Sequence, residues 1–242
     1  MSFDVHQIRK DFPILADLMH GTQPLVYLDS AATSQKPIQV LDAERDFYLH
    51  HNGSAHRGAH ALAEAATLAY EDSRRVIAEF IGAREDRVVF TKNATEGLNL
   101  VAYAYANATA KARNGVEASQ QFILNAGDEI LVSEMEHHAN LIPWQELSQK
   151  TGAVLRFIPI TDDGRLNFTA ELINEKTRIV ALTQQSNILG TINDVSGIAV
   201  LAHAVGAKVV VDACQSVPHM SVNVDAIGAD FFAFSGHKML GP

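Results

Sequence analysis

The chain has 242 residues, of which 47% are hydrophobic and 19% are charged, and it carries a formal net charge of −9. This balance describes a globular protein with a large core, and the acidic charge argues against a nucleic-acid surface, which needs clustered Lys and Arg. No apolar run approaches the roughly 20 residues that cross a bilayer, and the N-terminus lacks a basic and then apolar leader pattern, so we expect no membrane contact and a cytoplasmic location. The single cysteine, Cys214, cannot form an intramolecular disulfide.

The residues before position 82 predict a mostly helical segment. The first helix is expected to end at Pro13, because the residue before a proline is pushed out of the helical region. A short strand is predicted over 25–29, and the His- and Gly-rich residues 50–58 predict a loop with a functional role. The predicted helices cover residues 5–12, 37–50 and 62–81.

From residue 87 onward, short apolar runs alternate with helical patterns, which is typical of an α/β fold. The runs are too uniformly apolar to face water on one side, so we expect a mostly parallel sheet covered by helices. The polar, Ala-rich residues 109–121 are expected to form a variable connection. Strands are predicted at 88–91, 129–132, 154–158, 179–183 and 209–212, and helices at 96–112, 141–150 and 195–205.

Polar residues follow four of these strands, and ligands of open α/β sheets bind beyond the carboxyl ends of the strands. Thr95 lies at the start of a helix, whose free N–H groups and dipole could hold a phosphate. A simple Thr cap before an acidic first turn is the structural alternative. Asn187, in the loop after the strand at 179–183, could hydrogen-bond a cofactor or substrate, or it could only shape the turn.

Two adjacent histidines follow the strand at 129–132, and neighbouring side chains there point in different directions. One imidazole could therefore stack on a flat ring or transfer protons. Zinc binding is the alternative, but neither an H-E-x-x-H pattern nor paired cysteines support it, so we expect no metal. The histidines concerned are His137 and His138, with His50, His51, His56 and His60 also available to a metal.

Asp212 and Lys238 are the most informative strand-end residues. A carboxylate that ends the buried run Val209–Val211 costs several kcal/mol unless it has a partner, which is either a neighbouring cation or helix N-terminus, or a protonated ring nitrogen. Lys238 follows the aromatic run 230–234 in a turn closed by Gly-Pro, where partial burial could let its amine attack a carbonyl. A surface lysine at a strand end is the structural alternative.

Together these residues match the requirements of pyridoxal 5′-phosphate. Its aldehyde needs a lysine, its pyridine nitrogen needs an acid, its phosphate needs an anion site and its ring needs a flat neighbour. All four kinds of group occur in chain order, each at a strand end of an α/β pattern. A Ser-His-Asp hydrolase is poorly supported, because no G-x-S-x-G turn follows a strand.

With these motifs assembled, the chain resembles the class V aminotransferase family, and within it the Suf-type cysteine desulfurases, also described as selenocysteine lyases. The likeness spans nearly the whole chain, and its most specific parts are the adjacent histidines and the lysine turn. The matching stretches are 27–32, 56–58, 93–97, 135–140, 186–190, 211–215 and 235–238.

The resemblance implies a role for each matching residue. Lys238 would bind the cofactor covalently, Asp212 would pair with the pyridine nitrogen, and His137 would stack on the ring and transfer protons. The other implied cofactor-binding residues are Gln215 and Asn187 at the ring hydroxyl or substrate, Thr95, Ser235 and His237 at the phosphate, and Ala94. The implied substrate-binding residues are Ala31, His56, Arg57 and Asn187.

The fold implied by the resemblance is that of the pyridoxal-phosphate-dependent transferases of fold type I, which are aspartate aminotransferase-like. We expect an N-terminal helical arm over 1–25 and, over 26–242, the large domain with a mostly parallel seven-stranded sheet, its C-terminal small domain being absent. The implied reaction converts L-cysteine, or L-selenocysteine, to L-alanine and transfers the sulfur as a persulfide for iron–sulfur cluster assembly. The implied partners are a sulfur-acceptor protein of the Suf system and a second copy of the chain in a homodimer.

The sequence departs from the family in two respects. Family members are longer, and their persulfide cysteine and carboxylate-binding arginine lie beyond the lysine, so we expect the chain to be a fragment that is inactive alone. Cys214 does not fill this gap, because its place beside Asp212 favours a buried packing thiol. Two alternatives remain open, namely another class V aminotransferase or lyase and a non-catalytic cofactor-binding fragment.

Overall fold

The computed structural model describes residues 3–242. Contacts divide the chain into two compact units. The first holds the N-terminal residues up to Phe80 together with 84–88 and 236–242, and the second holds 81–83 and 89–235. The boundary at residue 25, which we expected between an N-terminal arm and the large domain, is not tested by this division by contacts and stays a prediction.

The second unit is built on a five-stranded sheet with the order β4-β3-β5-β6-β7, in which every neighbouring pair is parallel. Thr183 pairs with Asp212, and Asp212 pairs with Ala233, so the last residues of three strands lie side by side. The α/β class is confirmed, with five strands in the described sheet rather than seven. The strands are β3 (Glu129–Ser133), β4 (Val154–Ile158), β5 (Thr177–Thr183), β6 (Lys208–Asp212) and β7 (Phe231–Ala233).

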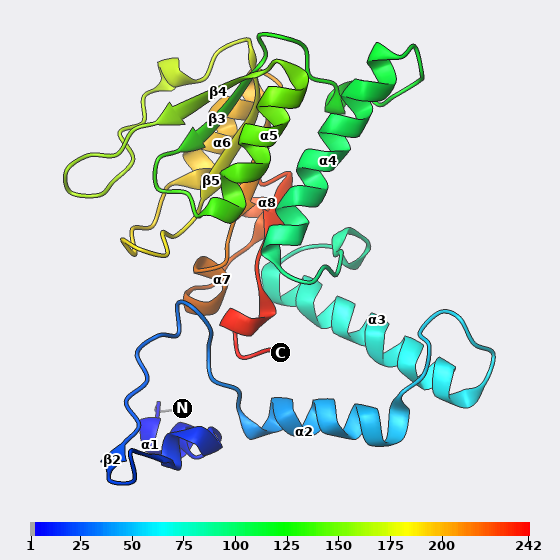
Figure 1. Cartoon of the computed structure of the whole chain (residues 1–242), viewed down its shortest axis with the longest axis vertical. Helices are drawn as coiled ribbons and strands as arrows, with labels where there is room; N and C mark the ends of the chain where they lie inside the picture. Colours follow the sequence, from blue (N-terminus) through cyan, green and yellow to red (C-terminus); the bar gives the residue numbers. More distant parts are fainter. Residues whose placement is uncertain (1–2) are drawn as a thin grey trace. The chain divides into compact units, whose positions relative to one another are not determined.

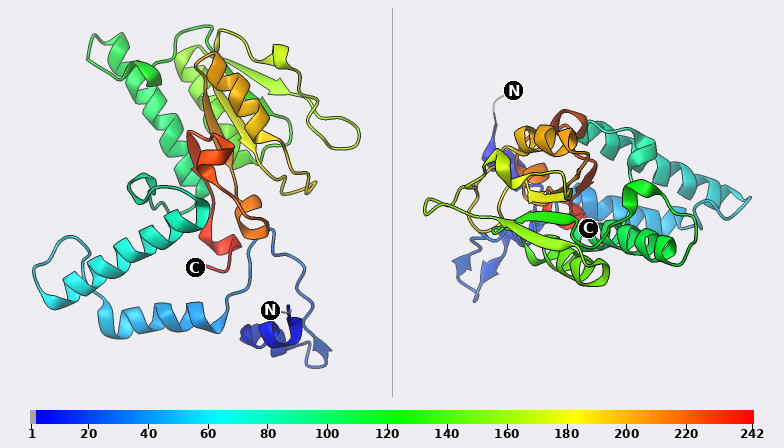
Figure 2. Two further views of the ribbon diagram at one scale, coloured as in Figure 1. Left: turned by 180° about the vertical axis from the view of Figure 1, so that it is seen from behind. Right: turned by 90° about the horizontal axis from the view of Figure 1, so that it is seen from above.

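Helices cover both faces of this sheet. α4 (Ala94–Arg113) and α5 (Ile142–Thr151) pack against each other on one face, and α6 (Val195–Ala204) and α8 (Val224–Ile227) lie on the other (Figures 1 and 2). The short α7 (Ser216–His219) follows β6. A sheet covered on both faces explains the uninterrupted apolar runs of its strands.

The core between α4, α5 and the sheet follows from the helical spacing of the sequence. Leu98, Ala102 and Tyr105 recur every three or four residues along α4, and all three are buried. They meet Trp144 and Leu147 of α5, which are 0% and 2% exposed. This packing holds the first turn of α4 beside the carboxyl ends of the strands, where the polar residues lie.

The first unit is mainly helical. It holds all of α3 except the last residue, Ile81, which belongs to the second unit. Gly82 follows this helix in the left-handed region, with φ 65°. Its elements are α1 (Val5–Arg9), a 3-10 turn (Pro13–Ala16), the antiparallel pair β1 (Leu18–Met19) and β2 (Gln23–Pro24), α2 (Ile38–Asp46) continued as a π-helix (Phe47–His51), α3 (Ala61–Ile81), a 3-10 turn (Glu85–Arg87) and the 3-10 turn Gly236–Lys238.

Two expectations about local structure were wrong. Residues 25–29 and 88–91 form no strand, and Leu28 and Val89 are 91% and 68% exposed. A strand requires a partner chain on at least one edge, and a local apolar run does not supply one. The helix expected over 96–112 is confirmed as α4, so the connection expected over 109–121 begins only after Arg113.

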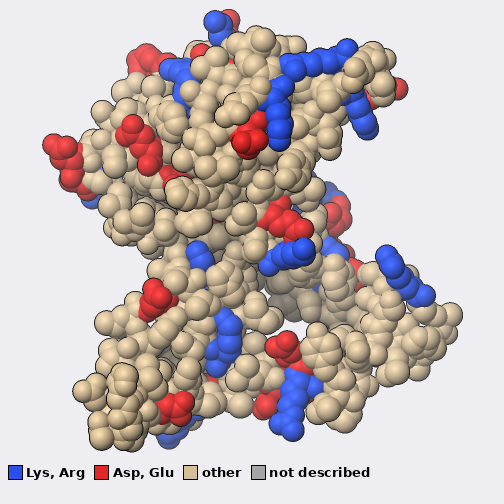
Figure 3. Space-filling model, in the orientation of Figure 1, with Lys and Arg blue, Asp and Glu red and all other residues tan. Residues whose placement is uncertain are grey.

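Charged side chains are scattered over the face drawn in Figure 3, where Lys and Arg alternate with Asp and Glu rather than forming a broad basic area. Within residues 3–242, no helix has the length and apolar character that a membrane crossing requires.

Candidate active site

The predicted site residues of the second unit follow from the parallel sheet. His137 lies after β3, Asn187 after β5, Asp212 at the end of β6 and Ser235 just after β7. Since β3, β5, β6 and β7 are adjacent and parallel, all four residues lie at one edge of the sheet. Ala94 and Thr95 open α4, and Gln215 precedes α7.

Asp212 has the features expected of a partner for a cationic ring nitrogen. The residue is 4% exposed, and its Oδ1 accepts the Cys214 amide at 3.0 Å. Among the described residues of this unit, neither a cation nor a second hydrogen-bond donor meets the carboxylate. A buried carboxylate held by one amide retains acceptor capacity for a ligand.

Ser235 and the first turn of α4 form a compact polar site. The Ser235 hydroxyl, 5% exposed, accepts the Ala94 amide at 3.0 Å. The helix is capped by Asn93, whose Oδ1 accepts the Glu96 amide at 2.9 Å, so the cap is not Thr95. A hydroxyl beside the N-terminus of a 20-residue helix provides donors and a favourable dipole for an anion.

Cys214 was expected to be a buried thiol, but it is partly exposed. Its Sγ lies 3.8 Å from the Ser235 hydroxyl. The thiol thus contacts a polar group at the strand-end edge, a contact that its place beside Asp212 in the sequence did not indicate.

The His137 ring is oriented by its own loop. Its Nδ1 accepts the Ala139 amide at 3.0 Å, which places the ring proton of the neutral form on Nε2. The His138 ring is tilted by 48° to it at a centroid distance of 6.2 Å, so the two imidazoles do face different directions. The exposed His137 is therefore available to stack on a ligand.

The loop after β5 offers acceptors as well. Its turn is shaped by Ser186, whose hydroxyl accepts the Leu189 amide at 3.1 Å, so Asn187 is not needed for the turn. In the described part of the chain, Oε1 of Gln184 and Oε1 of Gln185 are buried without a hydrogen-bond partner. Unpaired acceptors at the edge that carries Asp212 are suited to a ligand with hydrogen-bond donors.

Glu136 is a half-buried acid that the sequence analysis did not single out. Its Oε1 accepts the Thr183 amide at 2.8 Å and the Ser133 hydroxyl, and its Oε2 accepts the Asn140 amide group at 2.7 Å. Burial raises the pKa of Glu136 to about 8, against the lowering effect of these donors, and the charge of Asp212 raises it further. An acid three residues after a buried strand and next to His137 was the available signal.

The lysine predicted to bind the cofactor belongs to the first unit, on a turn that we call the lysine turn, residues 236–242. The His237 carbonyl accepts the Ser34 amide at 2.9 Å and Lys36 Nζ at 2.9 Å, and the Leu240 amide donates to the Ser34 hydroxyl at 2.8 Å. The backbone on both sides of Lys238 is thus held by residues 34–36. Burial, followed by the charges of Lys238 and Lys36, lowers the pKa of the His237 imidazole.

The predicted substrate residues of the first unit have different surroundings. His56, in the left-handed region with φ 61°, bonds through Nε2 to Glu71 Oε1 at 2.9 Å, and its ring meets Tyr70 edge-on. Arg57 is exposed, and its amide donates to the Ser54 carbonyl. Ala31 is exposed in a turn after residue 29. Among the described residues, the hydrogen bonds of His56 and Arg57 lead to Glu71 and Ser54 rather than to each other.

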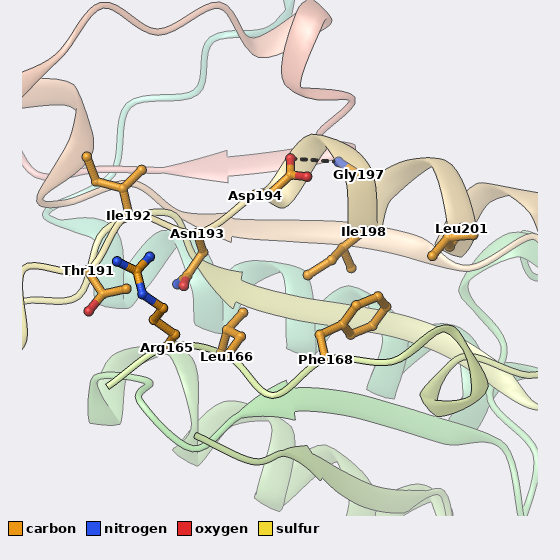
Figure 4. A pocket seen from close by; sticks show the side chains of 10 residues that line it. All are labelled: Arg165, Leu166, Phe168, Thr191, Ile192, Asn193, Asp194, Gly197, Ile198 and Leu201. Atoms are coloured by element: carbon orange, nitrogen blue, oxygen red, sulfur yellow. Dashed lines mark hydrogen bonds between the residues drawn. The ribbon is translucent and has the colours of Figure 1, made fainter. Parts of the chain in front are cut away.

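A pocket of about 500 Å³ lies elsewhere on the second unit, between residues 165–168 and the start of α6 (Figure 4). Its polar side chains already have partners, since Asp194 accepts the Gly197 amide at 3.0 Å and Asn193 donates to the Thr183 carbonyl at 2.8 Å. None of the predicted site residues lines it. Over residues 3–242, no group of three or more His, Cys, Asp and Glu side chains is arranged to hold a metal ion.

A comparison with models of protein families identifies the family of the chain. The model described as "Aminotransferase class-V" matches residues 26–242. The chain belongs to the class V aminotransferase family. The matched residues include all seven stretches that carry the resemblance, from 27–32 to 235–238.

Curated relatives of this class V chain are named as cysteine desulfurases. A probable cysteine desulfurase 2 from Mycobacterium leprae is 51% identical over 239 residues, covering 99% of this chain and 55% of the relative. A cysteine desulfurase from Dickeya dadantii is 49% identical over 243 residues, with the same coverage. The chain therefore spans about half the length of the curated relatives that it matches.

Solved structures give the same result for the fold. The apo structure of a cysteine desulfurase from Thermococcus onnurineus is 39% identical with a TM-score of 0.87, covering 100% of this chain and 56% of that one. A cysteine desulfurase from Escherichia coli, with an S-sulfonic acid, is 37% identical with a TM-score of 0.80 over the same shares. The fold is thus that of the pyridoxal-phosphate-dependent cysteine desulfurases.

Proposed function

We propose that the chain binds pyridoxal 5′-phosphate at the strand-end edge and belongs to a cysteine desulfurase. The observation that carries the proposal is the buried Asp212 carboxylate, which has one backbone donor and no cation within its unit, next to the polar site of Ser235 and the α4 N-terminus. An acid for the ring nitrogen and donors for a phosphate are what this cofactor requires of a protein. The relatives named as cysteine desulfurases at about 50% identity support the choice of reaction.

In this proposal each residue of the second unit acts on one part of the cofactor. Asp212 keeps the ring nitrogen protonated, His137 stacks on the ring and moves a proton at Nε2, and Ser235 donates to the phosphate. Ala94 and Thr95 offer the amides of the first helical turn to the same phosphate. Asn187 and Gln215 hydrogen-bond the ring hydroxyl or the substrate.

The first unit is proposed to supply the lysine. The support for this assignment is that Lys238 follows Ser235 by only three residues in the chain. His237 would add a phosphate contact. Ala31, His56 and Arg57 are proposed to bind the substrate, with support from the sequence resemblance alone.

The proposed reaction converts L-cysteine to L-alanine. The bound cofactor would supply an electron sink for the charge that develops at the substrate α-carbon. The C–S bond then breaks, the sulfur passes to a protein thiolate as a persulfide, and a proton replaces it on the substrate. Action on L-selenocysteine, an acceptor protein of the Suf system, iron–sulfur cluster assembly, a homodimer and a cytoplasmic location are proposed on the resemblance.

Product analysis tests the reaction. We expect residues 1–242 alone to form no alanine from L-cysteine, whereas a protein of the relatives' full length, given pyridoxal phosphate, L-cysteine and a thiol reductant, should form alanine and sulfide in equal amounts. Transfer of the amino group to a keto acid would instead identify an aminotransferase, and pyruvate would identify a lyase. A loaded protein that forms none of these would be a cofactor-binding chain without catalysis.

A further inference from the structure

Glu136 connects two neighbouring strand ends of the candidate site. It lies three residues beyond Ser133, the last residue of β3, and its Oε1 accepts the amide of Thr183, the last residue of β5, at 2.8 Å. Its Oε2 accepts Asn140 Nδ2 at 2.7 Å, at the other end of the same loop. The Glu136 carboxyl group therefore links the loop between β3 and α5 directly to the end of β5, next to an indirect link in which Asn193 Nδ2 donates to Met135 Sδ and to the Thr183 carbonyl.

Trp144 determines which side-chain atom of Asn140 faces Glu136. The Trp144 indole can only donate, and its Nε1 donates to Asn140 Oδ1 at 2.9 Å in the core. Asn140 must then present Nδ2 to Glu136, and the Thr183 amide can also only donate. Glu136 thus meets an obligate donor on each oxygen, which a carboxylate satisfies and a glutamine, with one oxygen and one NH₂ group, cannot.

The same connection fixes His137 relative to Asp212. His137 is the residue after Glu136, and Thr183 pairs with Asp212 in the sheet. The Gln184 amide, the next along, donates to the Asp212 carbonyl at 3.0 Å. A displacement of Glu136 would change the spacing between the imidazole and the Asp212 carboxylate.

We propose that Glu136 is a positioning residue of this site, which holds the His137 loop against the end of β5 and so sets the distance from the stacking imidazole to the acid at the ring nitrogen. The cofactor part of this statement rests on the proposed function. The acid can accept both donors in either protonation state, since the O–H of its protonated form can donate to the Ser133 hydroxyl, whereas an amide would leave one donor unpaired.

The first test uses the chain without cofactor. Hydrogen–deuterium exchange is measured for residues 134–140 in Glu136→Gln, Glu136→Ala and the control Glu134→Gln. Glu134 lies in the same loop and is exposed, and within residues 3–242 its carboxylate accepts the Ile160 amide at 3.1 Å. Both Glu136 variants should exchange about tenfold or more faster over this loop, and the control should not. Unchanged exchange in the isosteric Glu136→Gln would overturn the proposal.

The second test is a double-mutant cycle on the dissociation constant of pyridoxal phosphate. Glu136→Gln should weaken binding about tenfold in the native background but less than about twofold in a His137→Ala background. An equal loss in both backgrounds would show that Glu136 does not act through His137, and would overturn its positioning role. If the native chain binds no pyridoxal phosphate, the proposed function and the cofactor part fail, while the exchange result still decides whether Glu136 holds the loop.

Discussion

Replacing Ser235 by alanine is expected to weaken the binding of pyridoxal phosphate to the chain. The hydroxyl is 5% exposed and lies 3.0 Å from the Ala94 amide. A hydrogen bond to a charged group contributes about 1.5–3 kcal/mol, but the variant also leaves the Ala94 amide unpaired in the free protein, which costs about 1 kcal/mol that a bound phosphate would recover. The net loss of about 0.5–2 kcal/mol corresponds to a dissociation constant raised about 2- to 30-fold.

The assay is a titration of the chain with pyridoxal phosphate, followed by the absorption of the bound cofactor. Ser148→Ala is the matched control, because Ser148 is a partly buried serine whose hydroxyl donates to the Ala153 carbonyl at 2.7 Å near the start of β4. That position lies at the opposite edge of the sheet from the strand ends. An unchanged dissociation constant for Ser235→Ala, or an equal loss for Ser148→Ala, would refute the phosphate assignment.

Two further predictions concern stability and the lysine turn. Asp230→Asn should lower the free energy of unfolding at pH 7 by about 1–2 kcal/mol, because the carboxylate accepts Lys208 Nζ at 2.7 Å. Burial raises the pKa of Asp230, but the hydrogen bonds from Lys208 and its neighbours outweigh it and the folded-state pKa is lowered. The contribution is therefore present above the unfolded pKa of about 4 and is lost as the pH falls through the folded value. Urea unfolding of the native protein and of Asp230→Asn, followed by the fluorescence of the single tryptophan, gives the difference between their free energies of unfolding at pH 7 and at pH 3. This difference should be smaller at pH 3, and an equal difference at both pH values contradicts the reasoning. Ser34→Ala removes the acceptor of the Leu240 amide, 2.8 Å away, so deuterium uptake over residues 236–242 should rise several-fold, whereas unchanged uptake would show that Ser34 does not hold the turn.

Much of the second unit could be predicted because its signals are local. Apolar runs too uniform for a half-exposed sheet predicted parallel strands, and the rule of carboxyl ends predicted that His137, Asn187 and Asp212 lie at one edge. The same rule was applied to Thr95, but the strand expected before it at 88–91 is absent. The position of each residue required only its place after a strand. The roles of these residues stay predictions.

What the sequence did not reveal depends on contacts between distant segments. Whether residues 25–29 and 88–91 become strands depends on a neighbouring strand, which no local pattern reports. The acceptor role of Glu136 depends on Thr183, 47 residues away, and the Ser235 site depends on Ala94, 141 residues away. Three-dimensional pairing, rather than residue type, made these groups part of the site.

Covalent capture of the cofactor tests the central claim most directly. The chain is loaded with pyridoxal phosphate and reduced with borohydride, and the added mass is located by peptide mass spectrometry. We predict one label per chain, on Lys238, with none in Lys238→Ala. A label on another lysine such as Lys36, or no label at all, would contradict the account.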